Sequence, residues 1–114
     1  MNQTETLINE VQEALRGGQL SSNPHQCALY RSMLSGEYSY LVGLVETIKA
    51  RKPVIWLEMR KNNKSDTATE KEYSATTDGI QEKQIEANIK RVEKLMTGLN
   101  SLIRLAEGEA VNQF

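Results

Sequence analysis

The feature that most constrains this chain is the spacing of apolar residues toward its C-terminal end. They follow one another at alternating intervals of four and three residues without a slip, at Ile85, Ile89, Val92, Met96, Leu99, Ile103 and Ala106. This spacing is typical of a coiled-coil seam, because it keeps one apolar stripe on one face of a helix. Leu95, Leu102 and Leu105 widen the stripe, so the helix has apolar surface for two neighbours. The pattern predicts a long helix over residues 78–107.

The length of this helix bears on the fold class. A helix over residues 78–107 would be about 45 Å long at 1.5 Å per residue. A compact globule of 114 residues would have a diameter of roughly 26 Å. We therefore predict a single all-α domain over residues 1–114, either an elongated helical bundle or a helical hairpin, with a long coiled-coil-like C-terminal helix.

A second long helix is predicted over residues 23–52, antiparallel to the first. Asn23 is a suitable N-cap and Pro24 suits the first helical position. Gly36 and Gly43 lie inside the pattern, and their missing side chains are expected to let a neighbouring helix approach closely. A single helix is favoured over the alternative of two helices separated near Gly36. Pro53 predicts the end of the helix, because the residue before a proline avoids the α region.

Two further segments complete the domain. Residues 1–18 predict an amphipathic helix with Thr4 as N-cap and Gly17-Gly18 as its stop, packing on the core or reaching for a partner. Residues 53–77 predict a basic and polar connector. Its first part, residues 53–60, reads as a short helix or a buried strand, and a helix is favoured because no other strand is available. Its polar part reads equally as a loop or as a short helix capped by Ser65 or Asp66, with Thr77-Asp78 capping the next helix.

The residue types available exclude several kinds of site. His25 and Cys27 are the only histidine and cysteine. A metal site needs three or four ligands, and a nucleophilic pair needs side chains that meet, so we predict neither. Glu10 and Glu13 resemble one carboxylate pair of the helical nucleotide pyrophosphatases, but the second pair is missing. We therefore predict no catalytic residues, no metal, no cofactor and no enzymatic activity.

Residues 49–64 form a basic segment in a chain whose net charge is −1. Six basic residues against one acid give this segment a charge of +5, which leaves −6 for the remainder. Such asymmetry is a candidate contact surface for nucleic acid or for a partner protein, with the one tryptophan available to stack on a base. The alternative is that the tryptophan fills the core and the basic residues complement helix C-termini. The candidate contact residues are Lys49, Arg51, Lys52, Trp56, Arg60, Lys61 and Lys64.

From residue 56 onward the sequence resembles small helical accessory proteins encoded by tailed bacteriophages and prophages. The resemblance rests on "KSDTAT", on "ATTDG" at the entry to the long helix, and on the ending "EGEAVNQF". It implies an accessory protein of the recombination and replication genes, or a protein that blocks a host defence system. It brings no catalytic residues.

These observations lead to a functional expectation. We expect a non-enzymatic protein that binds another phage or host protein of a nucleic-acid-processing or defence machine, with direct DNA or RNA binding as the alternative. The C-terminal stripe has more apolar surface than one neighbouring helix covers, which predicts a homo-oligomer, with a dimer favoured. The sequence shows no secretory signal pattern and no apolar run long enough to span a membrane, so a soluble protein of the host cytoplasm, without a membrane partner, is expected.

Overall fold

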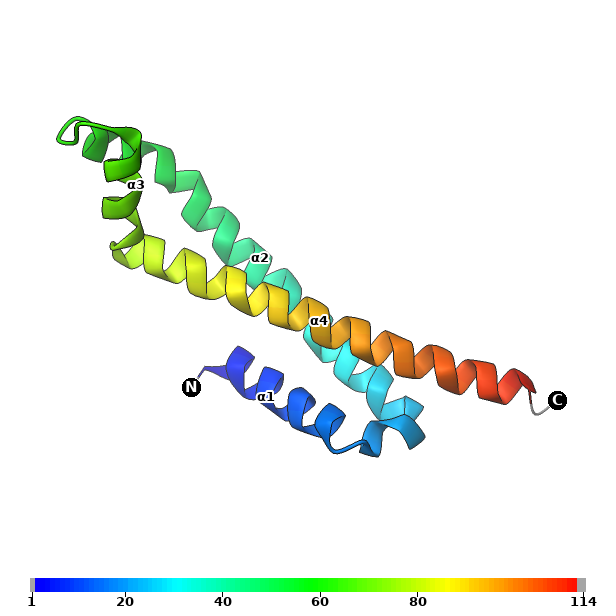
Figure 1. Cartoon of the computed structure of the whole chain (residues 1–114). Coiled ribbons are helices and arrows are strands. Elements are labelled where there is room, and N and C mark those ends of the chain that lie inside the picture. The colour runs from blue at the N-terminus through cyan, green and yellow to red at the C-terminus, as the bar shows by residue number, and fades with distance from the viewer. Residues whose placement is uncertain (1, 113–114) are drawn as a thin grey trace. The chain divides into compact units, whose positions relative to one another are not determined.

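The computed structural model describes residues 2–112, and the side chains of residues 2–108. The fold is all-α, as predicted, and these residues contain no strand. Four α-helices and one 3₁₀ helix follow one another along the chain (Figure 1): α1 (Gln3–Arg16), η1 (Gln19–Ser22), α2 (Pro24–Arg60), α3 (Asp66–Ser74) and α4 (Thr77–Asn112). None of them has the length and apolarity needed to cross a membrane, over the residues that the structure describes.

The chain forms two compact units. The α1 unit comprises the described residues of Met1–Ser39 and Asn88–Phe114, and the α3 unit comprises Tyr40–Ala87. In each unit the segments of α2 and α4 are antiparallel: Arg31 bonds Asn100 in the α1 unit, while Lys49 pairs with Glu86 and Arg51 with Asp78 in the α3 unit. The two predicted long helices and their direction are therefore present.

Helix α1 begins at Gln3, two residues earlier than a cap at Thr4 predicts. The Asn2 side chain accepts a hydrogen bond from the backbone N–H of Glu5 at 2.8 Å, and the predicted cap, Thr4, lies inside the helix. Asparagine is the stronger N-cap, which explains this choice. The hydroxyl of Thr4 is buried and donates to Glu37 of α2 at 2.6 Å. The helix stops before Gly18, which has the left-handed φ of 73° that glycine permits. Met1, in the predicted element 1–18, is outside the described residues.

Helix α2 confirms its predicted start and corrects its predicted end. The Asn23 side chain accepts from the backbone N–H of Gln26 at 3.1 Å, and Pro24 is the first helical residue. The prediction that the helix of residues 23–52 stops before Pro53 is wrong, because α2 continues unbroken to Arg60. Pro53 is exposed, so water can reach the carbonyl group that the proline leaves without a donor. Residues 55, 56, 59 and 60 beyond it are half-buried, and their packing offsets the cost of the proline.

The close approach expected at Gly36 and Gly43 does not occur. A Cβ atom added at either position would meet no atom within 4 Å. The close approach lies instead at Gly79, in the first turn of α4. A Cβ there would collide with the carbonyl oxygen of Tyr73 and would lie 2.8 Å from the Cα atom of Ser74. Because these are backbone atoms, only glycine fits without a shift of the chain.

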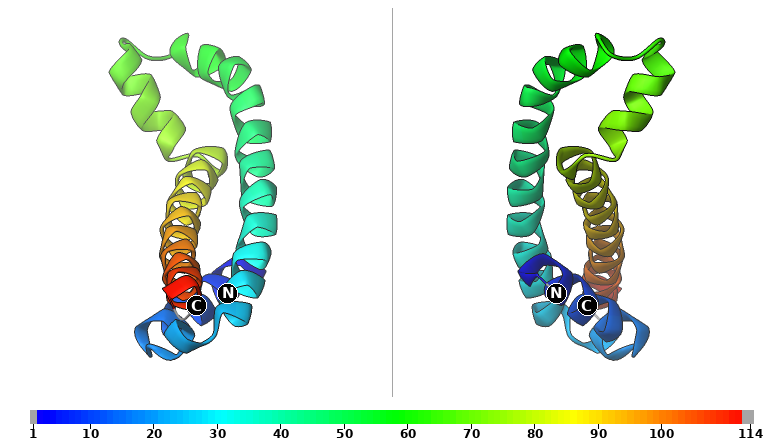
Figure 2. Two further views of the ribbon diagram at one scale, coloured as in Figure 1. Left: turned by 90° about the vertical axis from the view of Figure 1, so that its right-hand side faces the viewer. Right: turned by 90° about the vertical axis from the view of Figure 1, so that its left-hand side faces the viewer.

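The connector of residues 53–77 is largely helical. Ser65 caps α3 by accepting from the backbone N–H of Ala68 at 3.1 Å. The cap of α4 is not Thr77 or Asp78 as predicted, but Thr76, whose hydroxyl accepts from the backbone N–H of Gly79 at 3.1 Å. Figure 2 shows α3 joining the end of α2 to the beginning of α4.

Each unit has its own set of buried residues. In the α1 unit they come from all its helices: Thr4, Leu7, Ile8, Val11, Leu20, Cys27, Leu34, Val92 and Leu99. In the α3 unit they are Leu41, Val45, Ile48, Thr69 and Tyr73. The polar connector thus supplies two core residues through α3, a result that its composition does not indicate.

Candidate functional site

The basic segment of residues 49–64 lies in the second half of α2 and the turn to α3, within the α3 unit. Three of its residues point to the neighbouring helices. The Lys49 ammonium lies 3.1 Å from Glu86 of α4, and the Lys52 ammonium lies 3.5 Å from Glu70 of α3. Arg51 binds both carboxylate oxygens of Asp78, at 2.6 and 2.9 Å.

These ion pairs alter proton affinities in the expected directions. The hydrogen bond from Arg51 lowers the pKa of Asp78, and the hydrogen bond to Glu86 raises the pKa of Lys49. Both carboxylates thus hold the basic groups in their charged forms. The same contacts link α2 to α4. Their carboxylates also neutralise positive charge that would otherwise be available to a phosphate ligand.

Arg60 is used by the turn that follows α2. Its guanidinium donates to Asp66 at 2.8 Å and to the backbone carbonyl of Asn63 at 2.6 Å. The Asn63 side chain in turn donates to the carbonyl oxygen of Met59 at 2.9 Å and to the Glu72 carboxylate. This network connects the end of α2 to α3, so the role of Arg60 in the structure is to order the turn.

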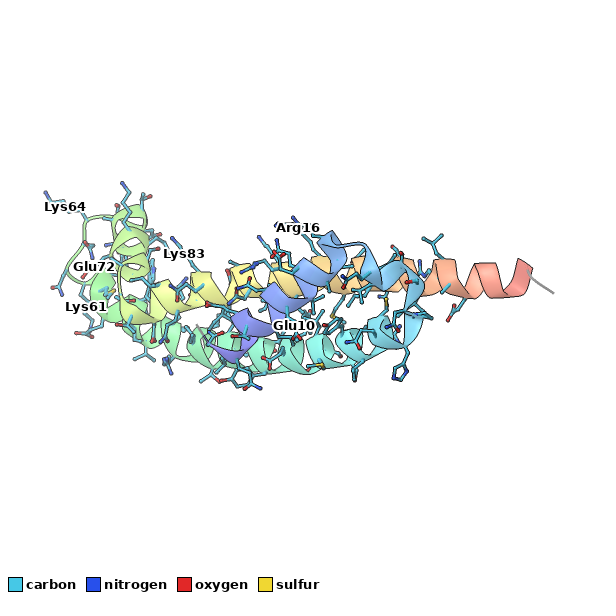
Figure 3. All side chains as sticks on the ribbon, turned by 90° about the horizontal axis from the view of Figure 1, so that it is seen from below. Glu10, Arg16, Lys61, Lys64, Glu72 and Lys83 are labelled. Carbon is cyan, nitrogen blue, oxygen red and sulfur yellow. The ribbon has the colours of Figure 1, made fainter. Side chains whose placement is uncertain are left out.

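Lys61 and Lys64 are the accessible remainder of the basic segment. Lys61, the first residue after α2, lies 3.1 Å from Glu58 in the last turn of that helix, and both side chains of this pair are exposed. Lys64 makes no ion pair with the residues that the structure describes, and its side chain points away from the ribbon (Figure 3). Leu57, one turn before Lys61, is 61% exposed. We name Leu57, Lys61 and Lys64 the corner surface.

Trp56 does not present its ring as an open stacking platform. It is half-buried, and its Nε1 atom is buried without a hydrogen-bond partner among the described residues. A tryptophan that stacks on nucleic-acid bases exposes a face of the ring. Its position agrees better with the alternative reading of the sequence, in which Trp56 fills space between helices.

Tyr73 is an interior residue that no motif of the sequence marks as functional. Its ring is buried, the Lys52 ammonium lies 4.7 Å from the ring centroid, and its hydroxyl has no hydrogen-bond partner among the described residues. Burial is the main cause that raises the pKa of Tyr73, and the Glu82 and Asp78 carboxylates add to it. A tyrosine four residues after a threonine in a capped nine-residue helix is the only sequence signal for this buried face.

A small open pocket of about 120 Å³ borders Tyr73. Its wall has two lysines and three glutamates, so no single sign of charge dominates it: Lys52, Glu70, Tyr73, Ser74, Gly79, Glu82, Lys83 and Glu86 line it. The volume is below the several hundred cubic ångströms typical of a small-molecule site. No cluster of three metal-ligating side chains occurs among the described residues.

The remaining candidate residues from the sequence do not form a site among the described residues. Cys27 is buried and its thiol donates to the Leu20 carbonyl at 3.3 Å, while burial raises the pKa of the thiol, which disfavours the reactive thiolate. His25 is exposed. Glu13 pairs with Arg16 of its own helix at 3.3 Å.

The predicted packing seam of α4 is used within the chain. Val92 and Leu99 are completely buried in the α1 unit. Four other predicted seam residues, Ile85, Ile89, Met96 and Ile103, are half-buried. The seam therefore finds most of its partners in the same chain, whereas Leu105, which widens the stripe, is 63% exposed.

Comparison of the chain with protein-family models, with curated proteins and with solved structures gives no match.

Proposed function

We propose that this is a non-enzymatic, phage-type accessory protein that binds another protein of a nucleic-acid-processing or host-defence machine. The observation that carries the proposal is the pairing of the basic segment. Of its six basic residues, Lys49, Arg51, Lys52, Arg60 and Lys61 each form an ion pair inside the chain. Paired cations have less to gain from phosphate, since counterion release depends on free positive charge.

The corner surface is the part of this segment that suits a protein partner. Leu57 offers exposed apolar area near the end of α2, and the exposed Lys61 and Lys64 follow it in the turn to α3. The Lys61–Glu58 pair is exposed on both sides and is screened by solvent, so it competes poorly with a partner's carboxylate. An acidic protein surface with an apolar patch fits this combination, and the encounter would be favoured by the opposite charges.

The sites expected of an enzyme do not support an alternative activity. The thiol is buried and the histidine stands alone. We place the protein's action in the cytoplasm of the host cell, where its partner would be a phage or host protein. Self-association as a dimer belongs to the proposal as well, although the buried residues of the α4 seam leave that face little free apolar surface.

Co-purification from cells of the natural host tests the proposed partner surface. The triple variant Leu57→Glu, Lys61→Glu, Lys64→Glu should lose a partner that the unaltered protein recovers in stoichiometric amount. A matched control is Lys90→Glu with Lys94→Glu, two exposed lysines of α4 outside the corner surface. Equal recovery with both variants, or no stoichiometric partner at all, would contradict the proposal.

A further inference from the structure

Residues 2–22 form a continuous segment that packs on the α2 and α4 segments of the α1 unit. The segment comprises α1 and η1, and it ends just before Asn23, the N-cap of α2. Figure 3 shows α1 lying across α2 and α4. We name residues 2–22 the lid. Its buried residues are Thr4, Leu7, Ile8, Val11 and Leu20.

The face of α2 and α4 beneath the lid is apolar. Four of its residues are completely buried, Cys27 and Leu34 of α2 together with Val92 and Leu99 of α4. Two helices alone leave their seam open to solvent on both sides, so complete burial of these residues needs a third element. Within the described part of the α1 unit, the lid supplies it. We name these four residues the covered face.

The polar contacts of the lid with α2 and α4 are mostly exposed to water. Exposed hydrogen bonds of 3.3–3.5 Å run from Tyr30 to Glu10 and from Arg91 to Asn9 and Gln12. Water can replace such bonds at little cost. The bond from Thr4 to Glu37 is shorter, at 2.6 Å, and part-buried. No ion pair joins the lid to the rest of the chain, over the residues that the structure describes.

The lid is built to separate as one piece. Its two elements contact each other, and the backbone of Asn23 after them is not helical, with φ −135° and ψ 75°. Rotation at this residue therefore moves the lid without disturbing a helix. The 14 residues of α1 are near the length of about 12–15 below which an isolated helix is marginal in water. A lid that has left the covered face should consequently lose its helix in the same step.

Cys27 reports on the position of the lid. Its thiol is completely buried and donates to the backbone carbonyl of Leu20, a lid residue, at 3.3 Å. It is the only cysteine of the chain. A reagent that modifies thiols therefore reacts with this protein only when the covered face is open to solvent.

We propose that the lid opens while α2 and α4 stay folded, and that the covered face then binds an amphipathic helix of another protein in place of α1. The contacts of α1 define the chemistry of that helix. It has apolar residues at the spacing of Leu7, Ile8 and Val11, and side-chain oxygens that accept hydrogen bonds from Arg91. The covered face belongs to the α1 unit and the corner surface to the α3 unit, so this inference does not rest on the partner proposed above.

The urea dependence of thiol modification separates opening of the lid from complete unfolding. In the full-length protein, the rate at which 5,5′-dithiobis(2-nitrobenzoic acid) modifies Cys27 is measured at urea concentrations below the unfolding transition. Opening of residues 2–22 exposes far less surface than unfolding of the whole chain. The logarithm of the rate should therefore rise with urea at less than about half the slope of the global equilibrium. Equal slopes would show that the thiol is reached only through complete unfolding and would overturn the proposal.

Two matched isoleucine variants test which unit controls access to the thiol. Ile8 of the lid and Ile48 of the α3 unit are both buried, with 1% and 4% of their surface exposed. Without urea, Ile8→Ala should speed the modification of Cys27 at least about thirtyfold, because it weakens the contact between lid and covered face. Ile48→Ala should leave the rate unchanged. Equal acceleration by both variants, or none by Ile8→Ala, would contradict an independent lid.

Binding of a helix to the open face is tested with a peptide. Val11→Asp should hold the lid open, because a charge cannot remain buried at this position. Circular dichroism of this variant should show a loss of helix no larger than that of the lid. A fluorescein-labelled peptide of residues 2–22 should then bind the variant with a saturable rise in anisotropy and slow the modification of Cys27. The same peptide carrying Val11→Asp is the control and should do neither. Complete unfolding of the variant, or no binding of the unaltered peptide, would overturn the proposal.

Discussion

Arg51 of α2 binds Asp78 of α4 through two hydrogen bonds, from Nε to Oδ2 at 2.6 Å and from Nη2 to Oδ1 at 2.9 Å. This pair lies where α4 begins, so the carboxylate also faces the positive end of a helix. The pair connects two segments separated by twenty-seven positions in the sequence. An arginine that the sequence offers as a nucleic-acid contact is thus a structural contact of the α3 unit.

The Arg51–Asp78 pair predicts how stability depends on pH. Its hydrogen bond lowers the pKa of Asp78 in the folded state. A carboxyl group with a lowered folded pKa stabilises the fold above its unfolded pKa of about 3.9, and this contribution disappears as pH falls through the folded pKa. Thermal unfolding followed by circular dichroism should therefore show that Asp78→Asn lowers the Tm at pH 7 and has little further effect at pH 2.

The matched control for this experiment is Glu58→Gln, whose partner Lys61 follows the end of the same helix and is about as exposed as Glu58. Its effect on the Tm should be small at every pH, since exposed pairs contribute little. An Asp78→Asn variant with the same Tm as the unaltered protein at pH 7 would show that the pair does not stabilise the fold.

Removing only the hydroxyl of Tyr73 should affect the free energy of unfolding differently from removing its whole ring. Tyr73→Phe should be neutral or stabilising, because the buried hydroxyl has no hydrogen-bond partner among the described residues. Tyr73→Ala should lower the free energy of unfolding by about 3–5 kcal/mol, as expected for a buried aromatic residue. Urea denaturation of the two variants provides the comparison, and a strongly destabilised phenylalanine variant would show that the hydroxyl has a partner.

The same tyrosine makes a prediction at alkaline pH. Burial raises its pKa in the folded state. The resulting stabilisation is complete below the unfolded pKa of about 10 and is lost as pH rises through the higher folded value. In ultraviolet titrations, Tyr73→Phe should remove one of the tyrosinates that form above the ordinary tyrosine pKa. An unchanged titration curve would contradict the burial of this ring.

Gly79 is predicted to be the glycine that cannot be replaced. Gly79→Ala should destabilise the fold by about 1–3 kcal/mol, because the new Cβ overlaps the backbone at Tyr73 and Ser74. Gly108→Ala, where a Cβ meets no atom within 4 Å, should instead be neutral or stabilise by up to about 1 kcal/mol. Chemical denaturation of both variants measures the difference, and equal effects would contradict the close approach at Gly79.

The α4 seam predicts a contrast between its buried and exposed residues. Leu99→Asp places a charge in the core of the α1 unit and should unfold that unit or cost more than about 3 kcal/mol. Leu105→Asp, at a position 63% exposed, should change the free energy of unfolding by less than about 0.5 kcal/mol. Circular dichroism and urea denaturation distinguish the two, and full stability of Leu99→Asp would refute the assigned core face.

Local capping chemistry explains why the starts of α2 and α3 could be predicted from the sequence. Asn23 and Ser65 each satisfy a backbone N–H three residues ahead, an interaction fixed by residue type and spacing. The 4–3 spacing likewise predicts that Val92 and Leu99 are core residues, and both are buried. These are signals within one helix.

The failures involve contacts between different helices, which a pattern within one helix does not reveal. Proline disfavours a helix interior, so Pro53 predicts an end of α2, but half-buried residues beyond it stabilise the continuation. The glycine that permits a close approach is expected inside α2 and is found at Gly79, where two helices join. At the candidate site, the acidic partners of Lys49, Arg51 and Lys52 come from α3 and α4, and no spacing rule within the basic segment identifies them.

The central claim is that the basic segment serves the fold and a protein partner, and not a phosphate backbone. Fluorescence anisotropy of a labelled oligonucleotide at low salt tests this most directly. We predict no change in anisotropy, because five of the six cations of the segment are paired within the chain and the remainder of the chain carries −6. Sub-micromolar binding at physiological salt would contradict the account, above all if log K fell by about 0.7–0.9 for each phosphate contact per tenfold rise in salt and Lys61→Ala with Lys64→Ala abolished it.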